Sequence, residues 1–98
     1  MIGYDCMARD VMMLVLKERR RQEQLKKEGK FYFDCGEKAV SHIRKLAVLS
    51  EEFGEVAKLI CDLDSSVKPT FTTEELRKEL IQVAAVCVAW VESLDNED

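Results

Sequence analysis

The sequence predicts an all-α protein, a helical bundle of about three main helices per chain that dimerisation completes. The chain of 98 residues contains one proline and only four glycines, so few residues interrupt a helix. No alternating apolar and polar stretch of useful length indicates a strand. Residues 81–91 are apolar on every side except at Gln82, as is typical of a helix surrounded by other helices. Three helices from one chain would struggle to surround it, so we expect a homodimer or a dimer of dimers.

We expect a single domain over residues 1–98, with an N-terminal helix within residues 1–29. This helix should begin at about Cys6 or Asp10 and stop at Gly29, because glycine commonly follows a helix end. Residues 30–38 break the helical periodicity and read as an ordered aromatic loop. Its aromatic side chains could close over a bound molecule or cover the end of the bundle; they are Phe31, Tyr32 and Phe33.

Two further helices are expected over residues 39–63 and 72–94. The last one has a clear start signal, because Thr72 and Glu75 have the spacing of a capping box. The turn between the two helices contains Pro69, the one proline of the chain.

Composition excludes several classes of function. A formal net charge of -4 argues against a general surface for nucleic acid, and the run Arg19 to Arg21, flanked by acidic residues, is typical of a solvated face. The longest apolar run, residues 83–91, is far shorter than the roughly 20 residues that a bilayer span needs. The four cysteines are widely spaced, which indicates free thiols. We therefore expect a cytoplasmic protein that binds neither membrane nor nucleic acid.

Two glutamates lie where the second helix should bury an apolar face. At about 100° per residue, Glu52 falls inside an apolar arc and Glu55 lies at its margin. The arc consists of Leu49, Phe53, Val56, Ile60 and Leu63. An ionised carboxylate there costs several kcal/mol unless a cation or a dense set of hydrogen bonds compensates it. A bound metal is the economical explanation.

The third helix carries a matching pair. Glu79 projects between Val86 and Trp90, and Gln82 follows it on the same face three residues later. If the two helices pack antiparallel, three carboxylates and an amide oxygen could converge. Hard oxygen ligands of this kind suit Mg²⁺ or Mn²⁺.

These residues resemble the MazG-like all-α nucleoside triphosphate pyrophosphohydrolases, whose motif is E-E-x-x-E, a spacer, then E-x-x-D. Here the motif reads Glu51-Glu52-Phe53-Gly54-Glu55, a spacer over residues 56–78, then Glu79-Leu80-Ile81-Gln82. The resemblance covers about half the chain. It implies Mg²⁺-dependent hydrolysis of a nucleoside triphosphate to the monophosphate and pyrophosphate, with Glu52, Glu55 and Glu79 as metal ligands.

The fourth position departs from the motif, because Gln82 stands where the family has Asp. An amide oxygen can coordinate but brings no charge, so one metal should bind more weakly or keep an extra water. The alternative function is therefore a catalytically weak or inactive helical dimer that serves as an interaction or nucleotide-binding protein.

Other residues have candidate roles around this motif. Glu51 could orient the attacking water or act as its base. The phosphates also need cations, for which Lys45, Lys58 and Lys78 are the candidates and Arg77 a further one. A surface or capping role suits His42 better than catalysis, and Phe53 and Trp90 are expected in the core.

Overall fold

The computed structural model describes residues 3–30, 35–61 and 71–95, and these residues form three helices and no strand. The helices are α1, Tyr4–Lys27; α2, His42–Cys61; and α3, Thr73–Asp95. The all-α prediction is confirmed. No helix in the described ranges combines the length and apolar character needed to cross a membrane.

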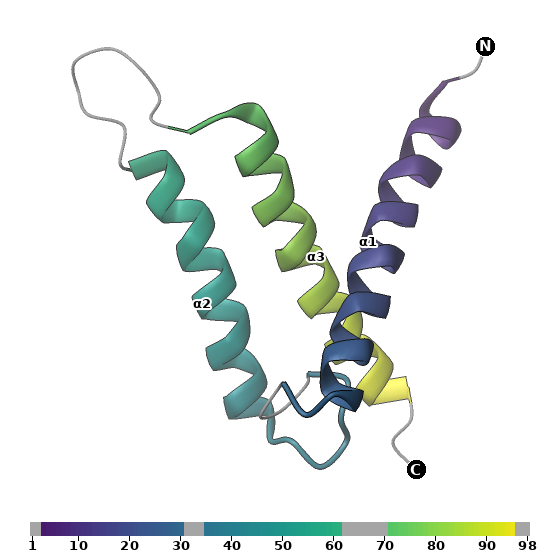
Figure 1. The fold of residues 1–98 in the computed structure, drawn as a ribbon, viewed down its shortest axis with the longest axis vertical. Coiled ribbons are helices and arrows are strands. Elements are labelled where there is room, and N and C mark those ends of the chain that lie inside the picture. The colour runs from purple at the N-terminus through teal and green to yellow at the C-terminus, as the bar shows by residue number, and fades with distance from the viewer. Residues whose placement is uncertain (1–2, 31–34, 62–70, 96–98) are drawn as a thin grey trace.

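Helix α3 lies between the other two, and it contacts both (Figure 1). Helices α1 and α3 run in the same direction, and α2 runs against them. Close backbone contacts join α2 to α3 and α1 to α3, but none joins α1 to α2. Among the helices that the structure describes, each outer one therefore has one neighbour within the chain.

The end of α1 follows the expected glycine signal. Gly29 adopts a φ of 72°, in the left-handed region that favours glycine. The Gly29 amide donates to the Lys26 carbonyl at 3.0 Å and the Lys30 amide to the Leu25 carbonyl at 2.8 Å, which is a Schellman motif. Helix α1 starts at Tyr4, before the predicted Cys6 or Asp10.

The other two helices begin at side-chain caps. The Ser41 hydroxyl accepts a hydrogen bond from the Arg44 amide at 3.2 Å, so α2 begins at His42 rather than at residue 39. At α3 the predicted capping box is confirmed, because the Glu75 amide donates to Thr72 Oγ1 at 3.1 Å. The aromatic residues 31–33 and the predicted end of the second helix lie outside the described residues.

The core within one chain is small. Val86 and Ala89 of α3 pack with Cys35, and Val48 and Leu49 of α2 lie against them. The radius of gyration is 15.6 Å, whereas a compact chain of this length would have about 13 Å. No disulfide joins the four cysteines.

The predicted apolar arc of α2 is split between two faces. Leu49 and Val56 face α3, but Phe53 is 64% exposed, so its expected place in the core is wrong for a single chain. Phe53 lies with Leu46 and Ile60 on a face about 70° away from the buried one, and both of those neighbours are also exposed. Trp90 is half-buried.

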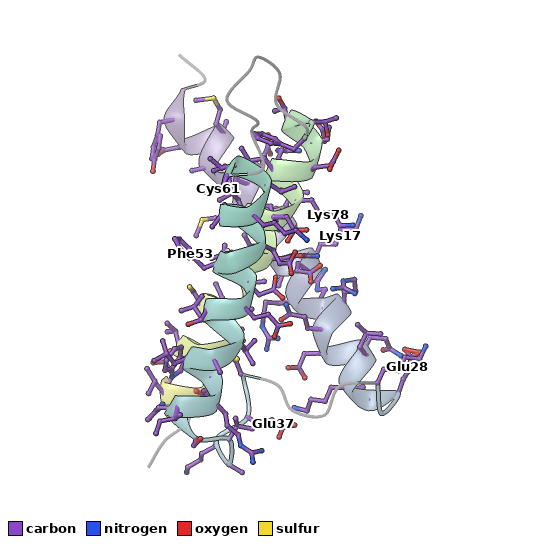
Figure 2. All side chains as sticks on the ribbon, turned by 90° about the vertical axis from the view of Figure 1, so that its left-hand side faces the viewer. Lys17, Glu28, Glu37, Phe53, Cys61 and Lys78 are labelled. Atoms are coloured by element: carbon purple, nitrogen blue, oxygen red, sulfur yellow. The ribbon has the colours of Figure 1, made fainter. Side chains whose placement is uncertain are left out.

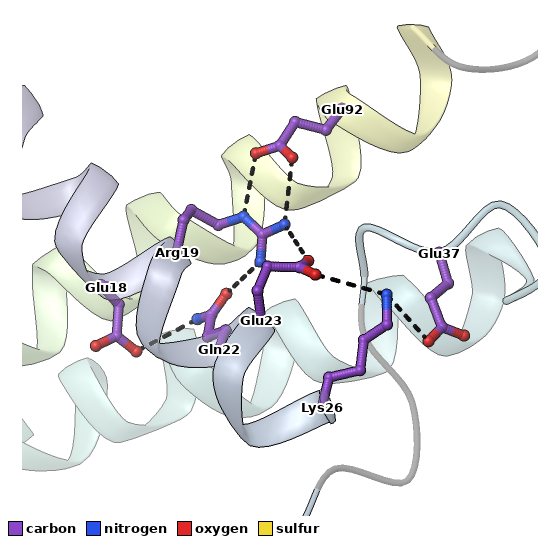
Figure 3. A network of polar contacts seen from close by, with 7 residues as sticks. All are labelled: Glu18, Arg19, Gln22, Glu23, Lys26, Glu37 and Glu92. Carbon is purple, nitrogen blue, oxygen red and sulfur yellow. Dashed lines mark hydrogen bonds and ion pairs between the residues drawn. The ribbon is translucent and has the colours of Figure 1, made fainter. Parts of the chain in front are cut away.

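A buried arginine connects α1 to α3 (Figure 3). Arg19 Nε donates to one oxygen of Glu92 at 3.1 Å and a second nitrogen donates to the other at 3.2 Å. Further bonds reach Gln22 and Glu23 at 2.9 Å. Arg19 is 5% exposed, so the prediction of a solvated face for this run is wrong at Arg19, while Arg20 and Arg21 are exposed.

Candidate functional site

Glu52 belongs to the face of α2 that packs against α3. That face includes Lys45, Leu49, Glu52 and Val56, at spacings of four, three and four residues, which places them in one row. Lys45 and Val56 are buried, and Leu49 and Glu52 are half-buried. A carboxylate in this row is partly withdrawn from water, as the sequence pattern predicted.

The environment of Glu52 disfavours its charged form. Burial raises the pKa of Glu52, and the negative charge of Glu79 on α3 raises it further. Smaller contributions in the same direction come from Glu51, Glu55 and Glu18. The charged neighbours that raise this pKa are all carboxylates. A cation held beside Glu52 would relieve both the repulsion and the desolvation.

The predicted ligands gather only in part. Glu79 and Gln82 are half-buried on α3, whereas Glu51 and Glu55 are exposed. Among the described residues, no group of three or more histidine, cysteine, aspartate or glutamate side chains is close enough to hold a metal ion. The donor chemistry of Glu52 and Glu79 fits Mg²⁺, but a third carboxylate would have to turn towards them.

Glu18 of α1 was not predicted as part of the site. Its two oxygens accept from Arg21 at 2.8 and 2.7 Å, and Gln22 donates to it at 3.4 Å. The bonds to Glu18 raise the pKa of Arg21, and the charge of Glu52 adds to that shift. Only the packing of α1 beside α3 brings Glu18 and Arg21 near Glu52. In the sequence, the spacing of Glu18 and Arg21 indicates a local ion pair and nothing more.

A groove of about 330 Å³ lies between α1 and α3. Its lining includes four cations, Lys17 and Arg21 of α1 and Arg77 and Lys78 of α3. In Figure 2, Lys17 and Lys78 lie together on the opposite side of α2 from Phe53. Gln82 also lines this groove, between the two helices. We call this feature the α1–α3 groove.

The three lysines predicted to bind phosphate lie in different environments. Lys78 is exposed in the α1–α3 groove, and Lys58 is exposed on α2 outside it. Lys45 is 1% exposed, and its Nζ donates to Ser93 Oγ at 2.7 Å. It is therefore not presented to a ligand in this chain.

His42 and Trp90 form a pair at the end of the bundle. Trp90 Nε1 donates to His42 Nδ1 at 3.0 Å, and the rings stack with centroids 5.9 Å apart. His42 is exposed at the first residue of α2, which agrees with the expected surface role.

Comparisons of the chain with family models, with curated proteins and with solved structures find no match.

Proposed function

We propose that the chain is a Mg²⁺-dependent nucleoside triphosphate pyrophosphohydrolase of the MazG-like kind. The single observation that carries the proposal is the half-buried Glu52 on the face of α2 that packs against α3, where burial and the charge of Glu79 on α3 both raise its pKa. Such an arrangement costs folding free energy, and carboxylates perturbed in this way cluster at functional sites. A bound divalent cation would relieve the repulsion among these carboxylates, and that relief would add to its binding free energy.

Each motif residue has a role in this proposal. Glu52, Glu55 and Glu79 would hold the metal, with Gln82 at the fourth motif position. Bound Mg²⁺ would polarise the phosphates and lower the pKa of the attacking water. Glu51 is exposed beside these ligands and is available to orient that water or take its proton. Lys78 and Lys58 remain candidates for phosphate contacts.

The test is pyrophosphate release from a panel of canonical and modified nucleoside triphosphates, with Mg²⁺ or Mn²⁺. Glu52→Gln and Glu79→Gln should abolish release, because each removes a ligand charge while nearly preserving side-chain size. Lys27→Gln is a matched surface control that should retain full activity, since Lys27 is exposed at the far end of α1. Absence of release from every substrate would reject the enzymatic proposal.

A second candidate function is a helical nucleotide-binding or interaction protein without catalysis. It is favoured by Gln82 in place of the motif aspartate and by the lack of three gathered carboxylates among the described residues. Calorimetry separates the two candidates, since only the enzyme requires specific binding of Mg²⁺ or Mn²⁺. If Gln82→Asp raised activity sharply, the chain would be a weakened enzyme rather than an inactive one.

We further propose that the functional unit is a homodimer or a dimer of dimers. The chain exposes 7530 Å², whereas a compact monomer of this mass would expose about 5,700 Å². The excess, about 1,800 Å², falls within the area that each subunit of an obligate dimer buries, about 1,000–2,500 Å². Large apolar side chains are exposed on all three helices, among them Met12, Phe53 and Val91.

A further inference from the structure

The α1–α3 groove concentrates positive charge on a chain that is negative overall. The chain has a formal net charge of -4, yet the groove is lined by Lys17, Arg21, Arg77 and Lys78 against two carboxylates, Glu18 and Glu74. Arg21 and Glu18 are already bonded to each other through two hydrogen bonds. The remaining cations therefore outnumber the remaining carboxylate.

Three of these cations have no ion-pair partner within the described part of the chain: Lys17, Arg77 and Lys78. A single exposed lysine is ordinarily solvated and needs no partner. Three unpaired cations around one hollow are different, because their mutual repulsion is relieved when an anion binds among them. Leu14 and Ile81, both partly buried, supply an apolar part of the lining.

Gln82 connects this groove to the motif. Its half-buried amide lines the groove beside the cations, whereas Glu79 of the same motif acts electrostatically on Glu52. Glutamine carries two N–H donors and no charge. At this position an aspartate would set a negative charge against the anion, while an amide can donate a hydrogen bond to it.

We propose that the α1–α3 groove binds the phosphate chain of the nucleotide, and that Gln82 contacts this chain as a hydrogen-bond donor instead of ligating the metal. This assignment rests on the proposed function for the identity of the substrate. At about 330 Å³ the groove is near the lower limit of small-molecule sites, which suits a phosphate chain better than a whole nucleotide. Its Arg21 end also responds to the charge of Glu52, so phosphates there would lie next to the proposed metal ligands.

The test uses inorganic tripolyphosphate as the probe, titrated calorimetrically into the full chain in EDTA at low ionic strength. The expected result is saturable binding of one tripolyphosphate per chain. Lys17→Gln, Arg77→Gln and Lys78→Gln should each weaken it about twofold to fivefold, the range for exposed charge pairs. Lys27→Gln is the matched control, since Lys27 is an exposed lysine of the same helix outside the groove, and it should not change the affinity.

Gln82 is tested with two variants. Gln82→Asp should weaken metal-free binding by a factor similar to the loss of one cation, and Gln82→Asn, which keeps the amide, should weaken it less. If both variants left metal-free binding unchanged while Gln82→Asp strengthened Mg²⁺ binding, Gln82 would be a metal ligand and the assignment would be wrong. Circular dichroism of each variant separates loss of binding from loss of fold.

Two results would overturn the groove itself: no tripolyphosphate binding in EDTA, or equal weakening by Lys27→Gln and by the groove variants. Failure of the proposed function has a different signature. In that case no nucleotide is hydrolysed, although tripolyphosphate still binds and responds to the groove variants as expected. The converse result is hydrolysis that depends on Glu52 and has the same KM in every groove variant. It would support the proposed function and reject the proposal that the groove binds the phosphate chain.

Discussion

Lys45 of α2 is almost wholly buried, and its Nζ donates to the buried hydroxyl of Ser93 on α3 at 2.7 Å. Ser93 in turn donates to the Trp90 carbonyl at 2.6 Å. Because Ser93 lies near the C-terminal end of α3, the ammonium also lies near the negative end of that helix dipole. One lysine thus joins the start of α2 to the end of α3.

This hydrogen bond predicts that the Ser93 hydroxyl contributes more to the free energy of unfolding than the Lys45 charge does. Ser93→Ala should lower the free energy of unfolding by about 1–3 kcal/mol, because it leaves a buried ammonium without that acceptor. Lys45→Met should be neutral or stabilise by about 1 kcal/mol, since it removes a buried charge and keeps the volume. Urea unfolding at fixed protein concentration measures both. The double variant should be more stable than Ser93→Ala alone, and the opposite order would contradict this account.

Arg19 should be the most sensitive arginine of its run. Arg19→Ala should destabilise the chain by about 3 kcal/mol, at the lower end of the range for a broken buried pair because Glu92 is half exposed and can rehydrate. Arg19→Lys should cost about 1–2 kcal/mol, because an ammonium cannot reproduce the two bonds to Glu92. The matched control, Arg20→Lys, should change the unfolding free energy by less than about 0.5 kcal/mol. Equal effects at Arg19 and Arg20 would contradict the network in Figure 3.

The contrast between these residues and the helix ends indicates what a sequence can reveal. Gly29 and the Thr72–Glu75 capping box act on neighbouring backbone, so their residue types predict their structure directly. Nothing in the run Arg19 to Arg21 tells which arginine turns inward, because its partner Glu92 is 73 residues away. The sequence therefore predicts features that depend on neighbouring residues, but it does not predict which distant residues pair.

The candidate site divides in the same way. The half-burial of Glu52 and its closeness to Glu79 could both be predicted from the helix faces on which the two residues lie. The α1–α3 groove could not be predicted from the sequence, because Lys17 and Lys78 come together only when α1 lies beside α3. The apolar pattern of α2 also could not show that Phe53 faces away from the chain's own core, since periodicity does not distinguish a face that meets α3 from one left exposed.

The raised pKa of Glu52 gives a pH dependence with a defined sign. The folded chain holds this proton more tightly than the unfolded chain, so stability falls as pH rises from the ordinary glutamate pKa through the folded one. Glu52→Gln should therefore raise the unfolding midpoint by a few degrees at pH 7 in EDTA, and the difference should vanish below about pH 4. Thermal unfolding at both pH values checks this. A Glu52→Gln variant less stable than the wild type at pH 7 would show that the carboxylate is satisfied.

Metal binding should reverse the order of stability of the wild type and Glu52→Gln. Excess Mg²⁺ should raise the unfolding midpoint of the wild type, because a ligand that binds only the folded chain stabilises it by mass action. Glu52→Gln should not respond. Thermal unfolding with and without Mg²⁺ gives the comparison, with Lys27→Gln as the responsive control. An equal response in Glu52→Gln would place the ion elsewhere.

Phe53 provides the test of self-association. It is 64% exposed on a face shared with Leu46 and Ile60, an arrangement that suits a second copy of the chain better than water. Phe53→Asp should shift the chain from dimer or tetramer to monomer in sedimentation velocity, because a charge would be buried unpaired in the interface. Ala47→Asp adds the same charge to an exposed position about 120° around α2 and should leave the assembly intact. A monomeric wild type, or an assembly that Phe53→Asp leaves unchanged, would exclude this face as the interface.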